Sequence, residues 1–259
     1  MSDLHPSAAQ GFTAGAGAYA RGRPDYPEAL LAWLAGDLGL GEGRACVDLG
    51  AGTGKFTRLL VRTGAQVTAV EPVAAMRREL AAALPGARAL DGTAQAMPLP
   101  SGSQDAVVCA QSFHWFAGPE ALREIHRVLR PGGSLGLVWN VRDESVDWVS
   151  AITRILELFE GDTPRFHTGR WRLPFAASPF TALEETCFSH QHAGPPQEVI
   201  IDRCLSVSFI AKLATGQKDQ VEAALRALIA GHPDLRDRET VAFPYHTHAY
   251  RCRSLSNVC

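Results

Sequence analysis

The stretch VDLGAGTGKF, residues 47–56, decides the fold of this chain. It begins in an apolar run typical of a buried strand, and a helical pattern follows it. Between the two, Gly50, Gly52 and Gly54 permit a tight turn in which a ligand can lie directly against the backbone. The pattern therefore predicts a strand, a ligand-binding turn and a helix in succession.

The spacing of these glycines separates two classes of ligand. A dinucleotide-binding loop follows the pattern G-x-G-x-x-G. Counted from Gly50, the sixth position is Lys55, and counted from Gly52 it is Thr57, so the last glycine is missing in both frames. What remains is D-x-G-x-G-x-G, beginning at Asp48. A nicotinamide-dependent oxidoreductase is therefore disfavoured.

An acidic residue follows the next predicted strand. The run QVTAV ends at residue 70, and Glu71 and Pro72 come directly after it. A carboxylate about 20 residues beyond a glycine turn is placed to accept the ribose hydroxyls of an adenosine. Glu71 is therefore predicted to bind a ribose.

Strands and helices alternate through the first half of the chain. Strands are predicted at 45–49, 66–70, 87–90, 106–110 and 135–139, and helices at 27–37, 55–63, 73–83 and 120–129, the last closed by Pro131, Gly132 and Gly133. The strands are nearly continuous apolar runs, which is typical of parallel strands covered on both faces. Strands separated by helices of this length indicate an α/β fold.

The regular alternation of predicted strands and helices ends after residue 140. Strands are predicted at 185–190 and 240–251, and helices at 197–213 and 219–230. We expect a single domain over 1–259, with a cap segment at 1–40, a cofactor-binding core at 41–145 and substrate-side helices and final strands at 146–259.

Composition limits the partners. The 259 residues carry a formal net charge of -2 and no run of five like charges, which argues against binding nucleic acid or an anionic membrane. No apolar run is long enough to span a membrane, and no Lys or Arg precedes Arg21 as it would in a secretory signal. The six cysteines are scattered, as in a reducing compartment. We expect a cytoplasmic protein.

Four further segments carry a family resemblance. They are AYARGRPDYPEALLAWL (18–34), GTAQAMPLPSGSQDAVVCAQSFHWF (92–116), EIHRVLRPGGSLGLVWN (124–140) and AFPYHTHAYRC (242–252). With the glycine turn, they resemble the class I methyltransferases akin to trans-aconitate and cantharidin methyltransferases. The resemblance implies a Rossmann-like fold with helices on both faces of a seven-stranded, mostly parallel sheet whose last strand is antiparallel. It also implies S-adenosyl-L-methionine as the cofactor.

The resemblance assigns roles to residues by position. The cofactor-binding residues that it implies are Asp48, Gly50, Ala51, Gly52 and Gly54 on the methionine side, Glu71 and Pro72 at the ribose, Thr93 and Ala94 at the adenine, Gln111 at the sulfonium, and Tyr19 and Arg23 in a segment that folds over the cofactor. Where relatives carry Gly-Asp-Ala, this chain has Gly92, Thr93 and Ala94, so a hydroxyl or a backbone amide must replace the carboxylate. Arg23 either pairs with the cofactor's carboxylate or only starts a helix.

His114 is the candidate catalytic residue. It lies with Trp115 and Phe116 just beyond the fourth predicted strand, where α/β folds place their binding crevice. All three are expected to contact the substrate, the two aromatic residues as an apolar wall. His114 is either a general base for a protonated nucleophile or a shaping residue, since a carboxylate acceptor needs no base.

Other basic residues leave alternatives open. The pairs His190/His192 and His246/His248 each share a strand face and are interpreted as solvated, with no metal site expected. Arg165, Arg170 and Arg172 either form a lid that attracts an anionic substrate or decorate a surface loop.

The function predicted from these features is methyl transfer to a small molecule, with a carboxylate or another oxygen nucleophile as acceptor. A protein or RNA methyltransferase and a non-catalytic S-adenosylmethionine-binding protein are the alternatives. The substrate and the oligomeric state stay open.

Overall fold

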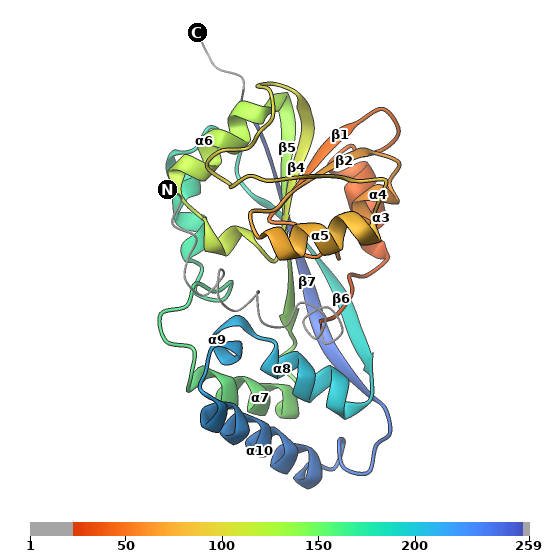
Figure 1. The fold of residues 1–259 in the computed structure, drawn as a ribbon, viewed down its shortest axis with the longest axis vertical. Coiled ribbons are helices and arrows are strands. Elements are labelled where there is room, and N and C mark those ends of the chain that lie inside the picture. Colours follow the sequence, from red (N-terminus) through yellow and green to blue (C-terminus); the bar gives the residue numbers. More distant parts are fainter. Residues whose placement is uncertain (1–22, 256–259) are drawn as a thin grey trace.

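One seven-stranded sheet organises the computed structural model, which describes residues 23–255. Its strand order is β3-β2-β1-β4-β5-β7-β6. The strands are β1 (Ala45–Leu49), β2 (Gln66–Val70), β3 (Arg88–Leu90), β4 (Gln104–Ala110), β5 (Leu129–Arg142), β6 (Glu184–Gly194) and β7 (Val241–Arg253). The sheet thus unites the two halves of the chain (Figure 1).

The direction of the strands confirms the predicted sheet. Strands β1 to β5 pair in parallel, and β7 pairs antiparallel with both β5 and β6. Within this sheet β7 alone runs against the rest. The order reverses at β1, with β2 on one side and β4 on the other, and such a reversal opens a crevice at the carboxyl ends of the strands.

Helices surround the sheet. Their bounds are α3 (Ala29–Gly36), α4 (Thr57–Val61), α5 (Ala74–Ala83), η1 (Phe113–Trp115), α6 (Pro119–Val128), α7 (Asp147–Glu157), η2 (Arg170–Ala177), η3 (Gln197–Asp202), α8 (Arg203–Leu205), α9 (Ser208–Ala211) and α10 (Thr215–Gly231). Helices α7 to α10 gather at the far ends of β6 and β7, away from α3 to α6 (Figure 1).

Side chains of the central strands point alternately into two apolar cores, one on each face of the sheet. Val47 and Leu49 of β1 face a core shared with α6 and η2, whereas Cys46 faces a core shared with α3 and α4. A third core lies between β7 and the helices α7 to α10, around Phe243 and Tyr245. The predicted strands fall on these cores because their apolar runs are buried on both faces.

Several predicted boundaries were wrong. The helix predicted over 197–213 is broken into η3, a π-helix, and the short α8 and α9, because the backbone is extended at Val207. The Pro131–Gly133 segment does not cap α6; it forms the start of β5, whose pairing with β4 shifts register there. Strands β5 and β6 are both longer than predicted. Tyr19 lies outside the described residues. No helix within 23–255 is long and apolar enough to cross a membrane.

Candidate active site

The glycine turn folds back over the end of β2. The three glycines have φ values of 71° at Gly50, 58° at Gly52 and 87° at Gly54, all in the left-handed region that glycine tolerates best. The Gly50 amide donates to the carbonyl of Val70 over 2.8 Å. A methyl group added at Gly50 would lie 2.8 Å from Cβ of Ser112, so only glycine fits there. The motif is required by both its angles and its neighbours.

Glu71 is held in the turn by two backbone amides. Its Oε2 accepts from the Gly52 amide at 2.9 Å, and its Oε1 accepts from the Val73 amide at 2.8 Å. The side chain is buried, and burial raises the pKa of Glu71 against the effect of these amides. Each carboxylate oxygen keeps a lone pair for a further donor. Glu71 is therefore a fixed acceptor at the end of β2.

Asp48 is a second buried carboxyl group at the turn. Thr57 donates to its Oδ2 over 2.6 Å, while Oδ1 is buried and has no hydrogen-bond partner. Burial raises the pKa of Asp48 to about 7, with Thr57 opposing the shift and Glu71 adding to it. A buried acceptor without a partner is costly, so a donor on a ligand would stabilise it.

These groups share a cavity of about 430 Å³. The predicted residues that line it are Arg23, Asp48, Gly50, Ala51, Gly52, Glu71, Pro72, Thr93, Ala94, Gln111, Trp115 and Phe116. Among the predicted residues within 23–255, Gly54 and His114 stand outside the lining. Gly54 lies against Leu80 and Leu84, and the ring of His114 contacts that of Trp115, with centroids 4.9 Å apart.

Residues that sequence reasoning missed also line the cavity: Lys55, Met76, Gln95, Asn140 and Arg203. Asn140 directly follows the apolar run of β5, and a polar residue at the end of a buried strand is a signal that points to a crevice. Arg203 had no such signal, because one arginine in a helical pattern is usually solvated.

Gln111 has a strained backbone at the end of β4. Its φ is 56°, a value uncommon for any residue with a side chain. Its amide donates to the carbonyl of Val138, and its Nε2 donates to the carbonyl of Asn140 over 3.0 Å. These bonds to β5 hold the strained residue at the floor of the cavity, and such strain is typical of functional positions.

The segment 23–26 is tied across the cavity. Lys55 donates to the carbonyl of Arg23 and forms an ion pair with Asp25 at 3.2 Å. Asn140 donates to the carbonyl of Asp25 over 2.9 Å, and Nη2 of Arg23 reaches the carbonyl of Ser206 at 3.5 Å. The glycine turn, β5 and α8 thereby place Arg23 on the cavity.

His114 is fixed by an indole. Nε1 of Trp139 lies 3.1 Å from Nδ1 of His114. Because an indole N–H can only donate, Nδ1 accepts, and the neutral ring carries its proton on Nε2. Burial lowers the pKa of His114 to about 3, and the charges of Arg165 and Arg23 act in the same direction.

The His-x-His pairs lie on opposite faces of the sheet. His190 and His192 stand opposite Tyr245 and Phe243 in the β6–β7 register and share their face, whereas His246 and His248 alternate with those residues on β7. The four imidazoles therefore do not converge. His246 pairs with Asp143 at 3.3 Å.

Arg165, Arg170 and Arg172, for which the sequence leaves both a lid and a surface loop open, separate in the structure. Arg165 turns inward over the ring of Phe209, 5.0 Å from its centroid. Arg170 is exposed, and Arg172 donates to the hydroxyl of Tyr250 over 2.7 Å. Only Arg165 approaches the region of His114.

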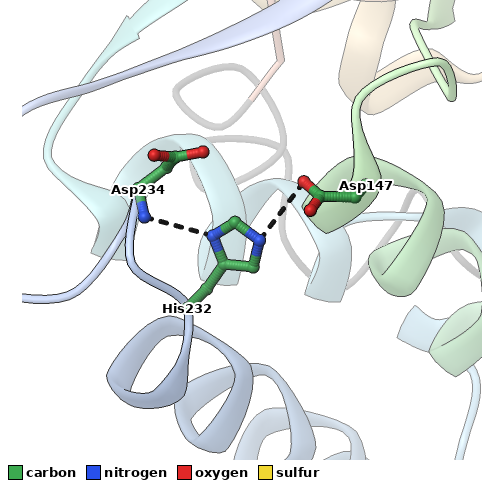
Figure 2. Close-up of side chains that lie close together, drawn as sticks. All are labelled: Asp147, His232 and Asp234. Atoms are coloured by element: carbon green, nitrogen blue, oxygen red, sulfur yellow. Dashed lines mark hydrogen bonds and ion pairs between the residues drawn. The ribbon is translucent and has the colours of Figure 1, made fainter.

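A group of three possible metal ligands lies elsewhere, where α10 ends beside the start of α7. His232 accepts a hydrogen bond from the Asp234 amide at Nδ1, over 3.2 Å, and pairs with Asp147 through Nε2, also at 3.2 Å (Figure 2). Both ring nitrogens thus have a partner within the protein. The cluster joins two helices.

Known proteins match this arrangement. Residues 47–137 match the family model of a methyltransferase domain. An uncharacterized methyltransferase of Mycobacterium tuberculosis is 40% identical over 243 residues, which is 93% of this chain and 94% of that protein. An uncharacterized methyltransferase-like protein of Schizosaccharomyces pombe is 35% identical over 233 residues, covering 90% and 91%.

Solved structures show the same fold. A protein of Anaeromyxobacter dehalogenans assigned as a type II methyltransferase is similar at a TM-score of 0.63 and 25% identity, over 89% of this chain and 96% of that one. YcgJ of Bacillus subtilis is similar at a TM-score of 0.58 and 17% identity, over 89% and 100%.

Fold and site together define the class as S-adenosylmethionine-dependent methyltransferases of class I. Within that class the chain belongs to the methyltransferase family of the mycobacterial and fission-yeast proteins. The names of those relatives specify no substrate. The narrower likeness to trans-aconitate and cantharidin methyltransferases stays a prediction.

Proposed function

We propose that the protein transfers the methyl group of S-adenosyl-L-methionine to a small-molecule acceptor, a carboxylate or another oxygen nucleophile. The observation that carries this proposal is one cavity in which the glycine turn, Glu71 and the aromatic residues Trp115 and Phe116 meet. Its volume of about 430 Å³ is within the range of small-molecule sites.

The methionine end of the cofactor fits the turn at Asp48. Its ammonium group would supply the donor that the buried Oδ1 lacks, and the positive charge would favour the ionised carboxylate. Gly50 and Gly52 let the cofactor approach the backbone. Arg23 is the candidate partner for the cofactor's carboxylate, in a bidentate geometry suited to arginine.

The adenosine end fits the part of the cavity that lies beyond the carboxyl ends of β2 and β3. Glu71 is fixed by two amides and accepts the ribose hydroxyls through its remaining lone pairs. The Thr93 amide is already donated to the carbonyl of Ala96 over 3.2 Å. The adenine contact therefore falls to the Thr93 hydroxyl or to the amide of Ala94.

The bound cofactor supplies a methyl group on a positively charged sulfur, which is already activated for transfer. The chain has to align the acceptor with that methyl group and exclude water. Gln111 is held rigidly at the floor of the cavity for the first task, and Trp115 and Phe116 form an apolar wall for the second.

His114 acts in this proposal as a residue that shapes the acceptor site through its ring contact with Trp115. A base must take up a proton, but Nδ1 already faces an indole N–H and Nε2 already carries a proton. A carboxylate acceptor is ionised near neutral pH and loses no proton on methylation. The neutral imidazole is consistent with such an acceptor.

Calorimetry with S-adenosylhomocysteine tests the cofactor assignment. We expect binding of this product with far weaker binding of NAD, and equal affinity for NAD would contradict the assignment. A transfer assay with radiolabelled methyl donor and a panel of small carboxylic acids, set beside bulk protein and RNA, then separates the alternatives. A macromolecular enzyme would label protein or RNA, and a non-catalytic protein would bind and never turn over.

A further inference from the structure

We propose that the acceptor carries an anionic group, a carboxylate or a phosphate, which Arg203 binds at the end of the cavity with Arg142 and Arg165 behind it. This inference rests on the proposed methyl transfer and names the chemistry of its acceptor.

Arg203 supplies the contact. It begins α8 directly after the π-helix η3, and its side chain lines the same cavity as the glycine turn. Its Nε and Nη1 are buried and have no hydrogen-bond partner. A guanidinium group that is desolvated without a counter-charge is costly, and an anion in the cavity beside Arg203 would neutralise it. The wide turn of a π-helix is frequent at functional sites.

Arg142 approaches from the end of β5. It stands opposite Tyr245 of β7 in the antiparallel register, and opposed residues share a face of the sheet. Burial raises the pKa of Tyr245, and the charges of Arg203 and Arg142 oppose this shift, with Arg203 also close enough to act on the hydroxyl as a hydrogen-bond donor. The two guanidinium groups therefore lie near the same buried hydroxyl.

Arg165 closes the cluster from the side of His114. Burial lowers the pKa of Arg165 to about 10, and Glu160 opposes this shift. The neighbouring positive charges, which act in the same direction as burial, are those of Arg142, Arg203 and Arg23. Burial, and after it the charges of Arg165 and Arg23, lower the pKa of His114 to about 3, so its ring stays neutral beside the cluster.

The described residues do not neutralise this cluster. Asp25 forms its ion pair with Lys55. Glu160 forms ion pairs with both Arg165, at 3.7 Å, and His167, at 3.3 Å. Between residues 23 and 255, no ion pair joins Arg142 or Arg203 to a carboxylate. Buried charges are normally paired, so a surplus of guanidinium groups beside a cavity points to an anionic ligand.

Calorimetry with matched probes tests the inference on protein saturated with S-adenosylhomocysteine. Succinate represents a carboxylate, inorganic phosphate represents a phosphate, and succinamide is the uncharged counterpart. We expect one of the anions to bind and succinamide not to bind. Arg203→Gln and Arg142→Gln should each weaken that anion at least about tenfold, the loss expected for a hydrogen bond to a charged group. Arg123→Gln, an exposed change on α6 away from the cavity, should leave it unchanged.

Thermal unfolding provides a second readout. Arg203→Gln removes one of several like charges, so the unliganded variant should melt no lower than wild type while its anion affinity falls. If Arg203 had only a structural role, the variant would lose both thermal stability and anion affinity. Should Arg203→Gln fail to fold, Arg142→Gln carries the same comparison.

Several outcomes would overturn the inference: no anion binding by wild type, equal binding of succinamide, or arginine variants that bind anions normally. A loss confined to S-adenosylhomocysteine affinity in Arg203→Gln would assign this arginine to the cofactor and overturn it too. If wild type failed to bind S-adenosylhomocysteine, the proposed function would fall, and anion titration of the cofactor-free protein would still decide the arginine site.

Discussion

The indole nitrogen of Trp139 lies 3.1 Å from Nδ1 of His114 and decides which of the two ring nitrogens of His114 carries the proton. Trp139 comes from β5 and His114 from the turn after β4, so the pairing of these strands sets the tautomer. An imidazolium at this position would direct two N–H groups at each other.

The first prediction follows from this bond. His114 stays neutral from pH 5 to pH 9, because its pKa is about 3 and the ring is uncharged above that value. His114→Gln should therefore raise the apparent KM for the acceptor with little change in kcat. It should remove no limb from the pH–rate profile. A limb near pH 6–7 that disappears in the variant would show that His114 is a general base.

Trp139→Phe is the matched change, since it keeps an aromatic ring and removes the N–H. Without the donor opposite Nδ1 the pKa of His114 should rise, while burial and the charges of Arg165 and Arg23 still hold it below the ordinary range; NMR of the imidazole follows it. An unchanged pKa would mean that burial alone keeps the ring neutral.

The second prediction concerns Asp48 and pH. Its pKa in the free protein is about 7, and the cofactor's ammonium favours the ionised form. Cofactor binding below pH 7 should therefore release a proton, and affinity should fall as the pH drops, by at most about tenfold per pH unit. Calorimetry at pH 6 and pH 8 in buffers of different ionisation enthalpy measures both effects.

Asp48→Asn should weaken cofactor binding at pH 8 and remove most of this pH dependence. Thr57→Val deletes the hydrogen bond that opposes the shift, so it should move the pH dependence upward. A pH profile identical in all three proteins would place the ammonium away from Asp48.

The third prediction concerns the ribose. Glu71→Ala removes the acceptor at the end of β2 and should cost about 1.5–3 kcal/mol of cofactor affinity, the range for hydrogen bonds to a charged group. Glu79→Ala, an exposed change on α5, is the control. Equal affinity in two folded variants would place the ribose elsewhere.

The fourth prediction separates two effects of replacing a glycine, the backbone strain of a positive φ and the steric clash of an added side chain. Gly50→Ala and Gly102→Ala both place a side chain at positive φ, 71° and 61° respectively, at a cost of about 1–2 kcal/mol. Only Gly50 has a neighbour at 2.8 Å, so Gly50→Ala should lower the free energy of unfolding further and weaken cofactor binding. Equal losses in denaturant titrations would mean that Ser112 moves aside easily.

Most of the residues predicted to bind the cofactor lie around one cavity, and the signals that indicate them are local. The glycine turn, Glu71 and the strands 45–49 and 66–70 are set by neighbouring residues, and the structure places them as expected. The Gly52 amide meets the Glu71 carboxylate because the turn and this residue follow the ends of two adjacent parallel strands.

The acceptor half could not be predicted in the same way. Arg203 reaches the cavity through a π-helix that interrupts an apparently regular helical pattern, and Arg142 reaches the same region through strand register. The orientation of His114 depends on Trp139, which the chain brings close only by pairing β4 with β5. Contacts between residues that lie far apart in the sequence produce no periodic pattern from which they could be predicted.

The position of β7 also bears on how the chain is made. This strand lies between β5 and β6, yet residues 241–253 follow β5 by about a hundred positions. During synthesis the backbone groups of β5 that pair with β7 stay unpaired until β7 has left the ribosome. The nascent chain therefore exposes an aggregation-prone edge for much of its translation, and holdase chaperones should capture it most strongly in that interval.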